Sequence, residues 1–234
     1  MPDVPSQRIV LARHTTPTGE IQLQQRPLAD GALAFEIIVD GVFLMASYNQ
    51  ASERAVARYA LDALPDAQSA LRLLVGGLGM GFTLQQALSN ERVAAVDVVE
   101  ISPHIVEWNH THFAPLNGHA LADPRVNLLQ DDLYVVLKAQ AERNVQYHAI
   151  LLDVDNGPSW LAHEDNARLY TAEALQHWST LLVPGGCLAI WSAQREPEFL
   201  ERLGMVFKQA EEVPFEVTGQ KGLVEQFVYQ AVKA

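Results

Sequence analysis

An apolar run, a glycine-rich turn and a helix-like stretch follow one another in LRLLVGGLGMGFTLQQAL, residues 71–88. The turn contains Gly76, Gly77, Gly79 and Gly81. Glycine permits positive φ and lets backbone amides approach a ligand, and the following helix presents the positive end of its dipole. We expect Thr83 to be the N-cap of this helix. The segment therefore predicts a strand, a ligand-binding turn and a helix of an α/β domain.

Apolar runs alternate with helical stretches from Leu71 onward. The runs are LRLLVGG, VAAVDVVE, VNLLQD, HAILLDVD and CLAIWSA. Runs of this kind suit parallel strands that helices cover on both faces. The last segments, EEVPFEVTG and LVEQFVYQAV around Gly219 to Gly222, indicate an antiparallel hairpin. The predicted fold is thus a doubly wound, Rossmann-like α/β domain with a mostly parallel sheet and a C-terminal antiparallel hairpin.

Residues 20–47 have a different pattern, with the short β-type runs IQLQQ, ALAFEIIV and VFLMAS. The pair Asp40-Gly41 between the last two runs predicts a tight hairpin. Ser52 is the expected N-cap of a helix, ERAVARYALDAL, that Pro65 ends. We therefore expect an N-terminal β-hairpin module with a linking helix in residues 1–66, and a ligand-binding α/β domain in residues 67–234.

The charge balance limits the classes of partner. The chain has 28 acidic and 16 basic side chains and a net charge of -12, which argues against nucleic acid or an anionic membrane and favours a small or cationic substrate. Its single cysteine, Cys187, cannot form an internal disulfide, and the segment MPDVPSQRIV has no apolar core typical of a signal peptide. No apolar run reaches transmembrane length. A cytoplasmic protein is expected.

An acidic residue follows the glycine turn at the spacing of a ribose-binding acid. The run VVEIS ends the next predicted strand at Glu100, about twenty residues further on, where a carboxylate can accept hydrogen bonds from both ribose hydroxyls. A nicotinamide-binding domain has the same layout, but its fingerprint G-x-G-x-x-G spaces the last two glycines more widely, whereas Gly77, Gly79 and Gly81 alternate strictly. The pattern favours a mononucleoside ligand; a purely structural turn is the alternative.

Two further acidic pairs follow predicted strands, Asp131 with Asp132 and Asp153 with Asp155. Ligands of open α/β sheets bind at the carboxyl ends of the strands, so these acids are expected to line one cleft. Helix N-capping by Asp131 or Asp155 is the structural alternative. The histidines His104, His110, His112 and His119 lack an acidic or cysteine partner at ligand spacing, and no metal site is predicted.

Several segments between residues 39 and 192 resemble the spermidine synthase family of aminopropyltransferases, which are relatives of the class I methyltransferases. These segments are VDGVFLMAS, VGGLGMG, VVEISPHIVEWN, DPRVNLLQDD, YHAILLDVDNGP and ARLYTAEALQHWSTLLVPGG. The resemblance implies a class I methyltransferase-like sheet domain, a small N-terminal β-module and a homodimer. It further implies that Glu100 binds ribose, that Asp131 binds adenine, and that Asp153 helps to deprotonate the attacking amine. Tyr170 matches a tyrosine of that family.

The chain departs from the family pattern at three places. Gly79 stands where the family has an aspartate that contacts the aminopropyl ammonium, and this removes a carboxylate that would repel the α-carboxylate of intact S-adenosylmethionine. The family's DSSDP is shortened to DVDN, which makes Asp155 the candidate for the second acid. The segment SYNQASERAVARYAL is expected to lack the family's glutamate, tyrosine and histidine cluster that lines the amine tunnel.

The resulting prediction is a transferase that alkylates a small acceptor, a polyamine or another amine, with S-adenosylmethionine or its decarboxylated form as co-substrate. Methyl and aminopropyl transfer are equally expected. Asp153 is the predicted base, with Asp155 and Tyr170 orienting the acceptor. The predicted co-substrate site comprises Gly76, Gly77, Gly79, Gly81, Glu100, Ile101, Asp131, Asp132 and Leu133. A nicotinamide-dependent oxidoreductase and a non-catalytic nucleoside-binding protein are the alternatives.

Overall fold

The computed structural model describes residues 8–17, 19–28, 30–219 and 222–234. Two parts of the predictions lie outside the described residues. They are residues 220 and 221 of the predicted C-terminal loop and residues 1–7 of the N-terminal segment MPDVPSQRIV. The chain divides into two compact units, Met1–Gln50 and Ala51–Ala234. The division therefore falls before the linking helix and not at residue 66. That helix belongs to the second unit because it packs on the strands of the larger sheet.

The first unit is a four-stranded antiparallel sheet in which each strand pairs with the next along the chain. Its strands are β1 (Ile9–Thr16), β2 (Gly19–Pro27), β3 (Leu33–Val39) and β4 (Val42–Ala46). The predicted hairpin between β3 and β4 is confirmed, with Asp40 at φ 49 and Gly41 at φ 76. Strand β1 was not predicted because its sequence, IVLARHTT, mixes apolar and polar residues without regular alternation.

The second unit contains a seven-stranded sheet with the order β10-β11-β9-β8-β5-β6-β7. The strands are β5 (Leu71–Gly76), β6 (Val93–Val99), β7 (Val126–Leu129), β8 (Tyr147–Leu152), β9 (Leu182–Ser192), β10 (Gln209–Gly219) and β11 (Gly222–Val232). Strands β5 to β9 pair in parallel, whereas β11 pairs antiparallel with both β9 and β10. The predicted α/β fold is confirmed, including its C-terminal hairpin.

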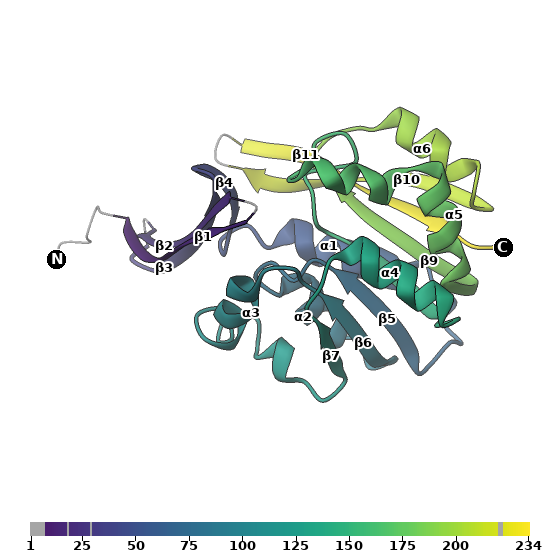
Figure 1. The fold of residues 1–234 in the computed structure, drawn as a ribbon, viewed down its shortest axis with the longest axis horizontal. Helices are drawn as coiled ribbons and strands as arrows, with labels where there is room; N and C mark the ends of the chain where they lie inside the picture. Colours follow the sequence, from purple (N-terminus) through teal and green to yellow (C-terminus); the bar gives the residue numbers. More distant parts are fainter. Residues whose placement is uncertain (1–7, 18, 29, 220–221) are drawn as a thin grey trace. The chain divides into compact units, whose positions relative to one another are not determined.

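Helices cover both faces of this sheet (Figure 1). They are α1 (Ala51–Asp62), α2 (Phe82–Leu88), α3 (Pro103–His110), α4 (Leu133–Glu142), α5 (Ala172–Thr180) and α6 (Pro197–Gly204), with 3-10 turns η1 (Ala120–Ala122) and η2 (Glu164–Tyr170). Helices α1 and α2 pack together on one face, and α4, α5 and α6 pack in sequence on the other. Within the described residues, no helix is long and apolar enough to cross a membrane.

Two predicted helix starts are each wrong by two residues. Helix α1 already begins at Ala51, so Ser52 lies in its first turn and its hydroxyl donates to Glu53 Oε2 at 3.0 Å. Helix α2 begins at Phe82 with Gly81 as its N-cap, because Gly81 adopts a left-handed conformation at φ 83. The Thr83 hydroxyl is thus not used for capping and is free to make a tertiary contact.

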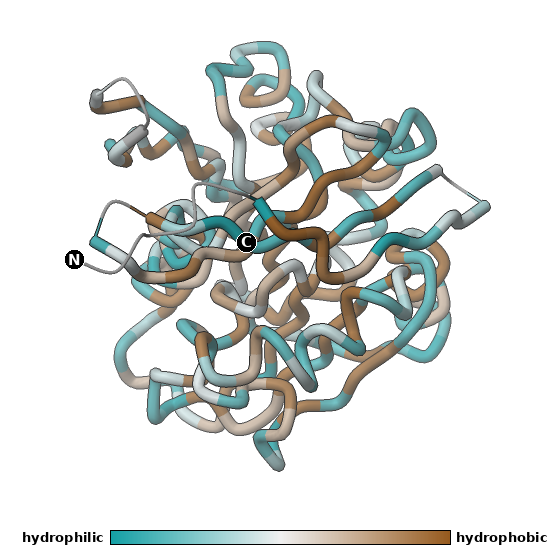
Figure 2. Tube along the Cα trace, turned by 90° about the vertical axis from the view of Figure 1, so that its left-hand side faces the viewer, coloured by the Kyte–Doolittle hydropathy of each residue, from teal (hydrophilic) through white to brown (hydrophobic). Residues whose placement is uncertain are grey.

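The core of the larger unit is formed by the strand interiors. Leu73, Leu74, Val75, Ile150 and Leu151, on the two central strands, are completely buried. Hydropathy colouring along the Cα trace shows brown hydrophobic stretches that alternate with teal hydrophilic ones (Figure 2). The buried strand interiors hold the strands in place, and the polar residues of the candidate site follow directly after the strand ends.

Candidate active site

The strand order reverses at β5, whose two neighbours in the sheet are β6 and β8. The chain continues from β5 to β6 and β7 on one side, and later returns to β8 and β9 on the other. Such a switch point opens a crevice at the carboxyl ends of the strands. Backbone hydrogen bonds join these ends, from Gly77 N to Val99 O at 2.9 Å and from Asp153 N to Gly76 O at 3.0 Å. The glycine turn and Asp153 therefore lie side by side.

The glycine turn adopts a left-handed backbone at three of its glycines. Gly77, Gly79 and Gly81 have φ values of 90, 51 and 83. A Cβ atom on Gly77 would lie 2.5 Å from the main-chain oxygen of Asp153, and one on Gly81 would lie 2.5 Å from Asn117 Nδ2. Neither position has room for a side chain, so the backbone of the turn lies close against its neighbours.

Two buried asparagines hold this turn, and the sequence analysis did not identify them. Asn109 Nδ2 donates to Gly79 O at 2.8 Å, and Asn117 Nδ2 donates to Met80 O at 2.9 Å. Asn117 also donates to Asn109 Oδ1 at 2.9 Å. Nothing in the local sequence distinguishes these asparagines from surface residues, because their partners are about thirty residues away along the chain.

We expect Gly77→Ala to destabilise the protein more than Gly185→Ala does. Both glycines have positive φ, but a Cβ on Gly185 meets nothing within 4 Å, whereas one on Gly77 meets main chain. The left-handed backbone alone costs about 1 to 2 kcal/mol, and the close approach at Gly77 adds roughly 1 to 3 kcal/mol. Urea unfolding of both variants measures the difference. Equal losses would show that the turn relaxes freely.

Glu100 lies beside the glycine turn, directly after β6. Its Oε1 accepts from Ser102 N at 2.7 Å and its Oε2 accepts from Leu78 N at 3.1 Å. Burial raises the pKa of Glu100, and the hydrogen bonds from main-chain amides act in the opposite direction. Two further amides, those of Gly79 and Ile101, also hydrogen-bond to this carboxylate. Main-chain amides therefore hold Glu100 at the edge of the glycine turn.

The acids after β7 have different surroundings. Asp131 is exposed, and its Oδ1 accepts a hydrogen bond from the neighbouring amide of Asp132 at 2.7 Å. Asp132 is the N-cap of α4, accepting from Val135 N at 3.1 Å, and it pairs with Arg168 at 2.6 Å. Helix capping thus accounts for Asp132, while Asp131 keeps an accessible carboxylate.

Two apolar residues of the predicted site border these acids. Ile101 follows Glu100 and is 59% exposed, so it offers an apolar surface to a ligand. Leu133 begins α4 and is buried, and its Cδ2 lies 2.6 Å from the position of a Cβ on Gly76. Ile101 thus faces solvent, whereas Leu133 packs under the glycine turn.

Asp153 follows β8 and is hydrogen-bonded to α2. Thr83 Oγ1 lies 2.9 Å from Asp153 Oδ2 and 3.1 Å from the main-chain oxygen of Glu53. Burial raises the pKa of Asp153 to about 6, and the Thr83 hydrogen bond opposes this rise. At neutral pH the group is therefore mostly ionised, yet it accepts a proton more readily than an exposed aspartate does.

Glu53, in the first turn of α1, is a second buried acid close to Asp153. Burial raises its pKa to about 8, and the nearby charge of Asp153 adds to the rise. The sequence analysis did not include Glu53 among the predicted site residues. The signal was present, because Glu53 is an acid that lies among the buried alanine and valine positions of an amphipathic helix.

Asp155 and Tyr170 are hydrogen-bonded to each other. Asp155 Oδ2 accepts from the Tyr170 hydroxyl at 2.7 Å, while Oδ1 accepts from Ala162 N at 2.7 Å and Asn166 Nδ2 at 2.9 Å. Burial raises the pKa of Tyr170 well above its usual value, and the charge of Asp155 adds to this effect. Asp155 therefore ties together the loop between β8 and η2.

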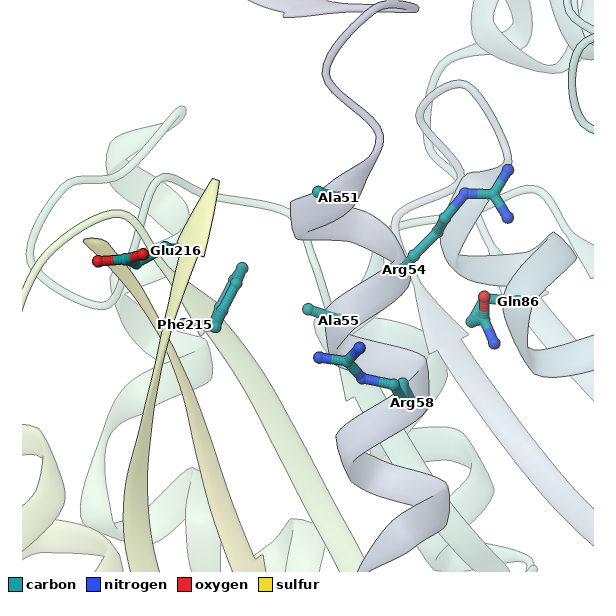
Figure 3. Close-up of a pocket in the computed structure, with 7 residues that line it drawn as sticks. All are labelled: Ala51, Arg54, Ala55, Arg58, Gln86, Phe215 and Glu216. Carbon is teal, nitrogen blue, oxygen red and sulfur yellow. The ribbon is translucent and has the colours of Figure 1, made fainter. Parts of the chain in front are cut away.

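A cavity of about 320 Å³ lies between α1, α2 and β10 (Figure 3). Its lining includes Arg54, Arg58, Gln86, Phe215 and Glu216. The Arg54 guanidinium donates to Gln85 Oε1 at 2.7 Å, and the Arg58 guanidinium lies 4.6 Å from the ring centre of Tyr59. None of the residues that line this cavity belongs to the predicted site.

The histidines singled out in the sequence do not form a cluster of ligands. His104 and His110 lie on α3, His104 packs near the Trp108 ring, and His119 precedes η1. Across the described part of the chain, no group of three or more histidine, cysteine, aspartate or glutamate residues is placed to hold a metal ion.

Comparison with known protein families gives a match to the spermine/spermidine synthase domain over residues 40–213. Among individual proteins, the chain is 29% identical over 140 residues to a polyamine aminopropyltransferase of Corynebacterium efficiens, covering 59% of this chain and 26% of that protein. It is 29% identical over 163 residues to a polyamine aminopropyltransferase of Prochlorococcus marinus, covering 68% and 53%. The chain thus spans about half or less of the length of these relatives.

Solved structures support the same fold. A spermidine synthase from Thermotoga maritima superposes with a TM-score of 0.74 at 17% identity, covering 96% of this chain and 73% of that one. A spermidine synthase in complex with the transition state analogue AdoDATO gives a TM-score of 0.76 at 16% identity, covering 96% and 74%. At these identities the likeness concerns the fold.

Proposed function

Since the chain belongs to the spermine/spermidine synthase domain family, we propose that it transfers an aminopropyl group from decarboxylated S-adenosylmethionine to an amine acceptor. The observation that carries this proposal is the position of Asp153, a carboxyl with a raised pKa beside the glycine turn of the family's domain. Family membership favours this reading over a nicotinamide-dependent oxidoreductase. The cytoplasmic location and the homodimer remain predictions.

The residues of the crevice fit the co-substrate. The glycine turn lets main chain approach the ligand, the Glu100 carboxylate beside that turn would meet the ribose hydroxyls, and exposed Asp131 is available to the adenine amino group. Ile101 offers an apolar surface at the same edge. The bound sulfonium supplies the electrophilic carbon.

Asp153 would remove the proton that blocks attack. An amine with a pKa near about 10 is mostly protonated at neutral pH and cannot act as a nucleophile. With its own pKa near 6, Asp153 is available in the ionised form to accept that proton. Holding the two reactants in line also lowers the activation barrier, by on the order of 7 to 11 kcal/mol in the best cases. Tyr170 and Asp155 would hold the loop that faces the acceptor.

Methyl transfer from intact S-adenosylmethionine is the second candidate, and Gly79 is the observation that favours it. The corresponding aspartate of the family would repel the α-carboxylate of the intact molecule by about 1 to 4 kcal/mol, and Gly79 removes this repulsion. Calorimetric titration with both molecules, followed by mass analysis of products with a panel of amines, separates the candidates. Methylthioadenosine with an aminopropylated amine supports the proposal, whereas a methylated amine contradicts it. A bound nucleoside that is never consumed indicates a non-catalytic protein.

We expect Gly79→Asp to shift co-substrate preference toward decarboxylated S-adenosylmethionine by about tenfold or more, because the new carboxylate attracts the ammonium and repels the α-carboxylate. The left-handed backbone at Gly79, φ 51, is one that aspartate and asparagine tolerate better than most residues. The ratio of the two dissociation constants is the measurement. Gly79→Asn is the matched uncharged control, and an equal shift in that variant would exclude a charge effect.

A further inference from the structure

Thr83 occupies a buried position between three elements of the site. It lies in the first turn of α2 and is 3% exposed, and its hydroxyl reaches Asp153 Oδ2 after β8 and the main-chain oxygen of Glu53 on α1. A threonine hydroxyl carries one proton and two lone pairs. It can therefore donate to only one of these two oxygens at a time, while its own oxygen remains able to accept.

We propose that Thr83 is a positioning residue that keeps Asp153 hydrogen-bonded both before and after Asp153 takes a proton from the acceptor ammonium. The inference rests on the proposed function, because it assigns Thr83 to the same proton transfer. Its basis is the pair of distances, 2.9 Å to Asp153 Oδ2 and 3.1 Å to Glu53 O.

The two states differ in the direction of the hydrogen bonds. When Asp153 is ionised, the Thr83 hydroxyl donates to Oδ2. When Asp153 holds the accepted proton on Oδ2, this O–H donates to Thr83 Oγ1, and the Thr83 proton turns to the main-chain oxygen of Glu53. A carbonyl oxygen has two lone pairs, so the Glu53 oxygen can accept this bond in addition to its helical one. No buried polar group loses its partner in either state, which avoids the cost of an unsatisfied group.

Two other titratable groups lie near Asp153. The charge of Asp153 raises the pKa of the Glu53 carboxyl on α1 and that of the Tyr170 hydroxyl at the end of η2. Neither group is hydrogen-bonded to Asp153 among the described contacts; Glu53 Oε2 accepts from Ser52, and Tyr170 donates to Asp155. The direct donor to the Asp153 carboxylate from a side chain is Thr83.

The test uses carboxyl NMR of the full chain without co-substrate, with Asp153→Asn to assign the signal. We expect Thr83→Val to raise the titration midpoint of Asp153 by about one pH unit, because the ionised form loses its donor. Thr83→Ser should restore the midpoint. In wild type and the serine variant, the main-chain carbonyl signal of Glu53 should also shift with the midpoint of Asp153, and this shift should vanish in the valine variant.

Thr180→Val is the matched control, because the Thr180 hydroxyl bonds only to His177 O in the described contacts and lies on the exposed end of α5. It should leave both signals unchanged. A folded Thr83→Val protein with an unmoved Asp153 midpoint would overturn the proposal, as would failure of Thr83→Ser to restore it. If valine prevents folding, Thr83→Ala is judged by the same criteria. Since no turnover is measured, the result stands apart from the test of transferase activity.

Discussion

Asp153→Asn is expected to lower turnover by roughly 10²- to 10⁴-fold while leaving co-substrate affinity unchanged. Asparagine has nearly the same shape and can still meet the Thr83 hydroxyl, but it cannot accept a proton from the acceptor. In the unaltered protein, kcat/KM should fall as the pH drops through about 6, where Asp153 becomes protonated. Steady-state kinetics across pH, with calorimetry for the co-substrate, measure both effects.

The control for this variant is Asp66→Asn, which alters an exposed aspartate beyond the end of α1. It should retain the activity and pH profile of the unaltered protein. Full turnover by Asp153→Asn, with unchanged co-substrate binding, would show that another group or the solvent takes the proton. The assignment of Asp153 as base would then be wrong, although the fold and family would stand.

Glu53→Gln is expected to make the protein progressively more stable than the unaltered protein as the pH rises from 5 to 8. The folded pKa of Glu53 is about 8, against 4.5 for the ordinary group, so between these values the folded state holds a proton that the unfolded state has lost. This stabilising contribution is complete below about pH 4.5 and is lost as the pH rises toward 8. Between these two pKa values, this group changes the free energy of unfolding by about -1.4 kcal/mol per pH unit.

Glutamine cannot titrate, so it removes this slope. The difference in unfolding free energy between the two proteins should change by a few kcal/mol over the interval, on the order of 4 at most. Urea unfolding at several pH values gives the difference directly, and subtraction cancels the groups that both proteins share. Glu107→Gln, on the exposed side of α3, should show no such trend. A flat difference for Glu53→Gln would mean that Glu53 is ionised in the folded protein.

The fold was predictable because its signals are local. Each parallel strand of the larger sheet is a short apolar run, and the glycine turn and the Asp40-Gly41 hairpin are encoded within a few residues. The long-range contacts were not predictable. Thr83 and Asp153 are 70 residues apart in sequence, and local capping rules assign the Thr83 hydroxyl to the wrong partner.

The candidate site likewise has residues that local sequence signals predict and residues that depend on long-range packing. The strand-end positions of Glu100 and Asp153 follow from the alternation of strands and helices, and the structure places both beside the glycine turn. Asn109 and Asn117 could not be assigned, because burial decides their roles and burial depends on packing between distant segments. Glu53 was marked only by its place among the apolar positions of a helix. The sequence analysis expected both Asp131 and Asp132 to line the cleft. In the structure Asp131 is exposed, and Asp132 is the N-cap of α4.

The hydrogen bonds of Asp155 have a consequence for how acceptor preference can change. This one carboxylate fastens Ala162, Asn166 and Tyr170, so the stretch from Asp155 to Tyr170 is held at several points, and exposed Trp160 lies within that stretch. Substitutions in that stretch can reshape the acceptor side without moving β8. The turn at Gly77 has no such freedom, because it touches the backbone of Asp153. Divergence in acceptor, natural or engineered, should therefore concentrate in residues 156–168.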